Sequence, residues 1–330
     1  MTHRVAPPIA METHVSVGPN RPRHLTSMES VMRRIFQISM LCLAAGVVNA
    51  CKPETEIITE DIPTAGVRFV NAVPDTGGMD FRPVDIVENT TFYNVAFKGT
   101  TLLYYKNARA GTRHFRIFRS PTSGTPPAEQ IAVASTVVFD LPAEELEAGK
   151  RYTYILWGLS RPGSTPAMRV TRIVDDPPDP GANVALRVIN ACVPGSCGTA
   201  ADGVVDVRAF TAAQTIAAPA ATWTALAPLT ASQYVSVAKG TYTYDVRPAG
   251  GATSGAALSS AAAPAGIAET VDIEALPGTN VSGSAVTAIL FPRNVVGSQA
   301  PTIATPGMIF VWDRRPPRCA TIVAPQVCQQ

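Results

Sequence analysis

The sequence contains two closely spaced cysteine pairs whose chemistry can be predicted from their spacing. Cys192 and Cys197 flank a Val-Pro-Gly-Ser turn, and Cys319 and Cys328 flank the last segment of the chain. Each pair could form a local disulfide in an oxidising compartment or contribute to a zinc site. Because this spacing without neighbouring histidines is poor for zinc, we expect two disulfides and no metal site.

Few residues after residue 50 could act as catalytic acids, bases or nucleophiles. Three of the four histidines lie in residues 1–50, which leaves only His114, and we expect its side chain to be exposed. The carboxylate pairs Glu144-Glu145 and Asp175-Asp176 are sequence neighbours and do not face each other across a bond, as a glycosidase requires. We interpret both pairs as solvated charges on loops. The alternative for Asp175 and Asp176 is weak calcium binding together with Asp179. The sequence therefore predicts no catalytic residue and no cofactor.

One stretch combines basic and aromatic side chains. Between residues 98 and 119, six lysines and arginines are interleaved with two tyrosines and two phenylalanines. We favour a half-buried pair of strands with solvated arginines outside. The alternative is a surface for anionic glycans or lipid headgroups, which would use charge and ring stacking. That candidate anionic-ligand surface consists of Arg109, Arg113, Arg116 and Arg119.

The charge balance changes when the N-terminal region is set aside. The whole chain has a formal net charge of +2. Five of its 27 basic residues and two of its 25 acidic residues lie in residues 1–50, which leaves 22 basic and 23 acidic residues. Without an excess of positive charge, the remainder has no field to attract nucleic acid, and we exclude a nucleic-acid partner.

The N-terminal region has the pattern of an export signal. Arg33-Arg34 precedes an apolar run from Ile35 to Val48. A helix of about fourteen residues would be roughly 21 Å long, shorter than the roughly 30 Å hydrocarbon core. We therefore predict a signal peptide over residues 32–50 and not a permanent membrane span. Residues 1–31 lack periodicity and predict an unstructured leader, which would also result from a start codon assigned too early.

The end of this signal resembles the lipobox of bacterial lipoproteins, in the sequence Val48-Asn49-Ala50-Cys51. The resemblance implies that the Cys51 thiol receives a diacylglycerol and that cleavage then exposes its amine. Each buried methylene contributes about 0.8 kcal/mol, so two or three acyl chains would hold the protein firmly at a bilayer. Lys52, in the place where aspartate would signal retention in the inner membrane, favours the outer membrane. The alternative is ordinary secretory cleavage after Ala50.

Short segments of the first half recur in the same order in the second half. Val67–Ala72 returns as Leu186–Ala191, and Gly111–Ile117 returns as Gly240–Val246. Five such matches occur in the same order, and the last of them aligns Met168 with Met308. The matched segments alternate between apolar and polar residues, as half-buried strands require.

Two other runs are more uniformly apolar, and we expect Tyr152–Trp157 and Ala132–Phe139 to be central strands. The 29 prolines and 24 glycines favour many short strands joined by turns over long helices. The predicted fold class is all-β, with two tandem immunoglobulin-like antiparallel β-sandwich domains after a lipoprotein signal peptide.

The opening of each half carries a family resemblance. The segment VRFVNAVPDTGGMDFRPVDI resembles the domain-of-unknown-function family 4397 (DUF4397), whose members begin with a V-R-x-x-[HN]-A-x-P-D strand and loop. The second half keeps Arg187, Asn190 and Ala191, but the Cys192–Cys197 insertion replaces its Pro-Asp pair. The resemblance implies exported, often lipid-anchored, immunoglobulin-like sandwiches, and it implies no particular reaction. The matching residues of the first half are Val67, Arg68, Asn71, Ala72, Pro74, Asp75 and Asp80.

We expect the domains to follow this order along the chain. After the leader (1–31) and signal peptide (32–50) come a tether (51–64), a first β-sandwich (65–175), a proline-rich linker (176–180), a second β-sandwich (181–318) and a C-terminal tail with a local disulfide (319–330).

These features predict a lipid-anchored cell-envelope protein that acts as a non-enzymatic binding or structural module. Its expected partners are the membrane, through Cys51, and an envelope glycan or protein. One alternative is an envelope-associated glycan or peptide hydrolase, which needs convergent catalytic groups in a cleft. The other is an accessory subunit of a surface complex, which would co-purify with its partners in detergent.

Overall fold

The computed structural model describes residues 61–317, apart from residues 89, 101–102, 123, 252, 271–272, 297 and 299–302. These residues belong to one compact unit, which begins at Asp61. The predicted leader, signal peptide, lipidation site Cys51 and Cys319–Cys328 disulfide lie outside the described residues. In the part of the chain that is described, no helix has the length and apolar character needed to cross a membrane.

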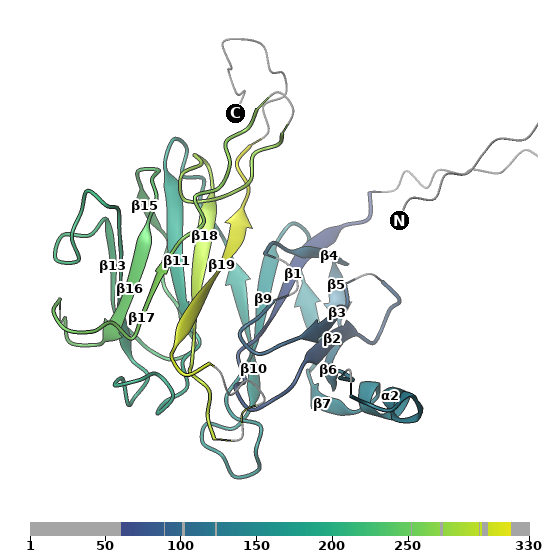
Figure 1. Cartoon of the computed structure of the whole chain (residues 1–330). Helices are drawn as coiled ribbons and strands as arrows, with labels where there is room; N and C mark the ends of the chain where they lie inside the picture. Colours follow the sequence, from purple (N-terminus) through teal and green to yellow (C-terminus); the bar gives the residue numbers. More distant parts are fainter. Residues whose placement is uncertain are drawn as a thin grey trace, which may run out of the picture. The chain divides into compact units, whose positions relative to one another are not determined.

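The first half of the unit forms two four-stranded sheets (Figure 1). The first inner sheet has the strand order β10-β9-β1-β4, and the first outer sheet has the order β3-β2-β6-β7; β5 and β8 pair separately. The strands of this half are β1 (Thr64–Asn71), β2 (Met79–Pro83), β3 (Phe92–Val95), β4 (Lys106–Arg109), β5 (Gly111–Arg113), β6 (Phe115–Arg119), β7 (Val137–Asp140), β8 (Glu144–Leu146), β9 (Arg151–Trp157) and β10 (Arg169–Asp175).

The second half has the same arrangement of sheets. The second inner sheet has the order β14-β11-β18-β19, with β15 also paired to β11, and the second outer sheet has the order β13-β12-β16-β17. Its strands are β11 (Val184–Asn190), β12 (Val205–Phe210), β13 (Ala221–Leu226), β14 (Thr230–Ala231), β15 (Val235–Val237), β16 (Thr243–Pro248), β17 (Ser259–Ala262), β18 (Ala285–Phe291) and β19 (Gly307–Arg314).

The predicted all-β fold is confirmed, but the inner sheets are mixed instead of purely antiparallel. β1 lies parallel to β9, and β11 lies parallel to β18, whereas the other pairs of described strands are antiparallel. Parallel neighbours need a long connection, and in each half the whole outer sheet lies between the two paired strands in the sequence.

The central strands of both inner sheets are buried on both faces, which explains the apolar sequences of β1, β9, β11 and β18. Successive side chains of a strand point to opposite faces. In β1, Val67 and Phe69 pack into the core of the first half, while Val70 and Ala72 point to the other side. There they meet residues of β11 and β18 in a shared apolar cluster of Val70, Ala72, Phe97, Ile155, Trp157, Ile189, Ala191, Val193, Ile289, Phe291 and Val311.

One predicted strand is wrong. The stretch Ala132–Phe139 divides between the end of a helix, α2 (Pro127–Ala134), and the edge strand β7. Figure 1 shows α2 beside β7, at the margin of the first half. Proline at the first helical position and Glu129 in the first turn both favour a helix start, and alanine favours the helix interior. Local helix signals therefore outweigh the apolar pattern there.

Two asparagines of the opening motif hold the turns that follow β1 and β11. The Asn71 amide donates to the carbonyl oxygen of Val95 at 2.9 Å, and its own oxygen accepts from the Val73 N–H at 3.1 Å. Asn190 does the same in the second half, donating to Leu226 and Gly203 and accepting from the Cys192 N–H. Both side chains are fully buried. The motif therefore fixes the conformation of these turns.

We expect Asn71→Ala and Asn190→Ala to lower the free energy of unfolding by about 1–3 kcal/mol each, because each change leaves buried backbone groups without partners. Asn183→Ala is the matched control, since Asn183 is exposed and its side chain makes a single 3.4 Å hydrogen bond within the described residues, to Ser236. Urea unfolding followed by tryptophan fluorescence would measure all three. Equal midpoints for buried and exposed variants would contradict this role.

Candidate functional site

The largest group of interacting charged residues that the structure describes lies between the two inner sheets. We call it the interface network, and it contains one Arg, one Asp, one Thr and one Tyr from each half. Its members are Arg68, Tyr105, Thr153 and Asp175 from the first half, and Arg187, Tyr234, Thr287 and Asp313 from the second.

The ion pairs of the network connect the two halves reciprocally. Arg68 Nη2 lies 2.7 Å from Asp313 Oδ1, and Arg187 Nη2 lies 2.6 Å from Asp175 Oδ1. Each arginine thus binds an aspartate at the C-terminal end of the last inner strand of the other half: Asp175 is the final residue of β10, and Asp313 is the last but one of β19. All four charged residues are at most 3% exposed. The pairs therefore hold one inner sheet to the other.

Hydroxyl groups satisfy the remaining polar atoms of this cluster. Thr153 accepts from Arg68 and donates to Asp175, and Thr287 accepts from Arg187 and donates to Asp313. The Arg68 guanidinium stacks 4.4 Å from the centre of the Tyr105 ring, and Arg187 stacks 4.5 Å from that of Tyr234. A buried charge is tolerated when it is paired and fully hydrogen bonded, and this arrangement meets that condition.

The tyrosines of the network act as neutral hydrogen-bond donors. The Tyr105 hydroxyl lies 2.9 Å from both Asp175 Oδ2 and Asp313 Oδ1, and the Tyr234 hydroxyl lies 3.0 Å from Asp313 Oδ2. Burial raises the pKa of both phenols well above the ordinary value. Each hydroxyl therefore keeps its proton and donates to a carboxylate.

Pairing outweighs burial in setting the pKa values of the charged groups. Burial alone would lower the pKa of Arg68, but the carboxylates of Asp313 and Asp175 raise it above its ordinary value. Burial alone would raise the pKa of Asp313, but Arg187 and Arg68 hold it below its ordinary value. The two cations and two anions leave no net charge, and their pairing stabilises the interface. Because these four residues are buried, the network is inaccessible to a substrate.

The role of Asp175 corrects a prediction. It is not a solvated loop charge: it is the last residue of β10, it is 3% exposed, and it binds Arg187. Asp179 pairs with Arg314 at 2.7 Å. Among the residues described, no group of three or more His, Cys, Asp or Glu side chains is placed to hold a metal ion.

Asp313 was not predicted as a counterpart of Asp175, because the alignment of Met168 with Met308 is shifted by two residues. Strand pairing sets Val170 against Leu156 and Met308 against Leu290, so Met308 corresponds to Val170 and not to Met168. With that alignment Asp175 corresponds to Asp313. An aspartate at the C-terminal end of both strands, after a β-branched or aromatic run, is the signal that could have revealed the network.

The arginines of the candidate anionic-ligand surface lie on β4, β5 and β6, and two of them already have acidic partners. Arg113 lies 3.4 Å from Asp85 and donates to three backbone carbonyls. Arg116 pairs with Asp140, which also contacts His114 at 2.6 Å. Arg109 and Arg119 are exposed. Of the four aromatic residues in this stretch, Tyr105 and Phe115 are buried, whereas Tyr104 and Phe118 are half-buried and already have guanidinium groups over their rings. A ligand role for this surface stays a prediction.

The turns after Asn71 and Asn190 meet at one end of the unit, which we call the paired-loop end. It comprises residues 72–78, 158–168, 191–204 and the described residues of 292–298. The Trp157 indole N–H donates to the Cys192 carbonyl at 3.2 Å, and the Ser298 hydroxyl donates to the Pro74 carbonyl at 2.5 Å. Loops from both halves are therefore fastened to each other.

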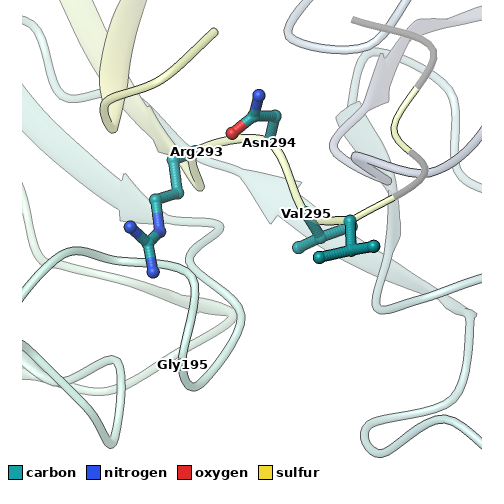
Figure 2. A pocket seen from close by; sticks show the side chains of 5 residues that line it. Gly195, Arg293, Asn294 and Val295 are labelled. Atoms are coloured by element: carbon teal, nitrogen blue, oxygen red, sulfur yellow. The ribbon is translucent and has the colours of Figure 1, made fainter. Parts of the chain in front are cut away.

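The predicted Cys192–Cys197 disulfide is confirmed, with a Cα–Cα distance of 5.8 Å. It closes a loop that forms one wall of a pocket at the paired-loop end. Figure 2 shows this pocket between the turn at Gly195 and the segment that follows β18. The pocket has a volume of about 510 Å³ and is lined by Gly195, Arg293, Asn294, Val295 and Val296. No pattern in the sequence indicated Arg293, because the opposite wall of the pocket, at Gly195, comes from a distant loop.

The chain was compared with known proteins at the level of sequence and structure. Residues 65–194 match DUF4397, "Domain of unknown function". This confirms the resemblance predicted from the opening motif. The match extends through β11, so it includes Arg68, Asp175 and Arg187 of the interface network and ends before Asp313. No curated protein matches the chain.

Two solved structures show weak similarity. The Bacillus anthracis TIE protein is 10% identical over 71% of this chain and 34% of its own, with a TM-score of 0.18. This chain thus spans about a third of that protein's length. A putative cell adhesion protein from Bacteroides uniformis ATCC 8492 is 12% identical over 78% of this chain and 98% of its own, with a TM-score of 0.16. At this level of similarity neither structure informs the function of this chain.

We expect Arg68→Met to lower the free energy of unfolding by about 3–5 kcal/mol, because it leaves the buried Asp313 carboxylate with one cation fewer. The matched control is Arg116→Met, which breaks an ion pair between two largely solvated side chains and should leave the unfolding midpoint unchanged. Equilibrium denaturation of both variants provides the measurement. Similar losses in the two variants would show that the network is not a principal source of stability.

The depressed pKa of Asp313 predicts a loss of stability in acid. The folded protein holds this carboxylate deprotonated more strongly than the unfolded chain does. Its contribution is therefore complete above the unfolded pKa of about 3.9 and is lost as the pH falls through the lower folded value. We expect the unfolding free energy of Asp313→Asn to be lower at neutral pH and to fall less steeply below about pH 5. Parallel pH profiles for variant and wild type would contradict this assignment.

Proposed function

We propose that this chain is an exported protein of the cell envelope, anchored through lipidated Cys51, in which residues 61–317 form a non-enzymatic binding or structural module. The Val48–Cys51 pattern and the apolar signal before it support the anchor. Lys52 supports the outer membrane over the inner one. The favoured partner is another component of the envelope, a glycan or a protein.

The direction of β1 is the observation that carries this proposal. β1 begins at Thr64, next to the tether, and ends at Asn71, where the paired-loop end begins. Eight residues of strand span roughly 26 Å. Figure 1 shows the start of β1 and the end of β19 on the upper side of the described unit, and the connections after β9 and β18 on the lower side. The tether therefore joins the described unit at the end of β1 opposite to the paired-loop end.

The rigidity of the unit supports a role in presentation. The interface network and the shared apolar cluster join the two inner sheets, so that loops from both halves keep fixed relative positions. Pre-formed surfaces bind with a smaller loss of conformational entropy than mobile ones. A rigid unit of this kind could display a binding surface, or it could hold a partner at a fixed distance from the bilayer.

Globomycin, which inhibits the lipoprotein signal peptidase, tests the anchor. We expect the treated cells to accumulate an uncleaved, diacylated precursor, and we expect Cys51→Ser to abolish labelling by radioactive palmitate. Cys42→Ser is the control, because Cys42 lies within the predicted signal peptide and should not affect lipidation. Unlipidated protein in the medium after normal cleavage of the wild-type chain would refute the anchor.

A further inference from the structure

The pocket at the paired-loop end has walls that are fixed before any ligand arrives. The Cys192–Cys197 disulfide closes the first wall, and within it the Gly195 N–H donates to the Ala201 carbonyl at 2.9 Å. The Arg293 N–H donates to the Ser196 carbonyl at 2.8 Å and thereby joins the two walls. A ligand would therefore meet a formed cavity, of about 510 Å³, which lies within the usual range of roughly 300–1,000 Å³ for small-ligand sites.

The lining of the pocket combines one positive charge with apolar groups. Arg293 is the only charged residue among the lining residues. Its side chain is exposed, and among the described residues its guanidinium has no ion pair, hydrogen bond or ring contact, in contrast to Arg187 and Arg314. Figure 2 shows the Arg293 side chain extending toward the turn at Gly195. The guanidinium is therefore available to an anion that enters between the two walls.

Two valines complete this surface. Val295 is half-buried, and Val296 is 87% exposed. Exposed apolar side chains beside a cavity favour contact with an apolar group of a ligand. None of the described residues that line the pocket is aromatic, so among them a sugar would find no ring on which to stack its apolar face. A guanidinium binds a carboxylate through two parallel hydrogen bonds, and the valines would accept an aliphatic group next to it.

We infer that this pocket binds the carboxyl terminus of a peptide whose last residue is aliphatic. The terminal carboxylate pairs with Arg293, and the last side chain packs against Val295 and Val296. This inference rests on the proposed function for one point, which is that the paired-loop end faces away from the anchor and is open to envelope peptides. The binding chemistry itself depends only on the residues of the pocket.

Fluorescence anisotropy with a short labelled peptide ending in Val-Val tests the inference on the purified full chain in detergent. We expect the free-acid peptide to bind, and we expect Arg293→Gln to weaken binding at least about tenfold, because a charge-assisted contact is lost. The amidated peptide should bind the wild type as weakly as the free acid binds Arg293→Gln. Arg161→Gln is the matched control, because Arg161 is exposed at the same end of the unit but does not line the pocket.

A second variant tests the apolar part of the site. Val296→Ser should weaken binding of the peptide ending in valine and leave a peptide ending in glycine unaffected. Unfolding midpoints equal to that of the wild type would show that both pocket variants are folded.

Three results would overturn the inference. They are equal binding of the acid and amide peptides, no binding of the acid peptide at millimolar concentration, and Arg293-dependent binding of glucuronate in place of the peptide. Because the assay uses purified protein, its failure leaves the lipid anchor untouched. Conversely, a failed globomycin experiment leaves the peptide-binding result standing.

Discussion

The reciprocal pairing of Arg68 with Asp313 and of Arg187 with Asp175 is the interaction on which the rest of the structure depends. Each half buries an arginine in its first inner strand but supplies the principal counterion to the other half. A guanidinium without a partner in an apolar interface would carry a large desolvation penalty. Each inner sheet can therefore bury the side that carries its arginine only when the other half is present to supply the counterion. The shared apolar cluster and the fastening of the loops follow from that contact.

The fold was largely predictable from the sequence because its signals are local. Alternation of apolar and polar residues, turn residues and the recurring opening motif all act within a few positions along the chain. The Cys192–Cys197 disulfide was predictable for the same reason. Even the uniformly apolar run at Tyr152–Trp157 indicated a central strand, although the structure was needed to show that its second face meets the other half.

Apart from the strand predicted at Ala132–Phe139, where local helix signals prevail, the errors occur where distant residues decide the outcome. A carboxylate next to prolines has the sequence of a loop, and its partners Arg187, Thr153 and Tyr105 allow Asp175 to be buried. The aromatic and basic stretch was correctly placed on strands, but the acidic partners of Arg113 and Arg116 come from other segments. The pocket is a still clearer case, because Gly195 and Arg293 lie about a hundred positions apart. Neither residue has a local pattern that distinguishes it from an ordinary turn.

The place of β1 in its sheet also has a mechanical consequence. β1 is an interior strand, paired with β4 on one side and with β9 on the other, and the chain enters it from its N-terminal end. Tension applied there acts along the strand, so it shears both ladders of hydrogen bonds together instead of peeling them one bond at a time. Arg68 adds a third attachment, to the opposite half. Drag on a tethered unit would thus be resisted by its most firmly held strand.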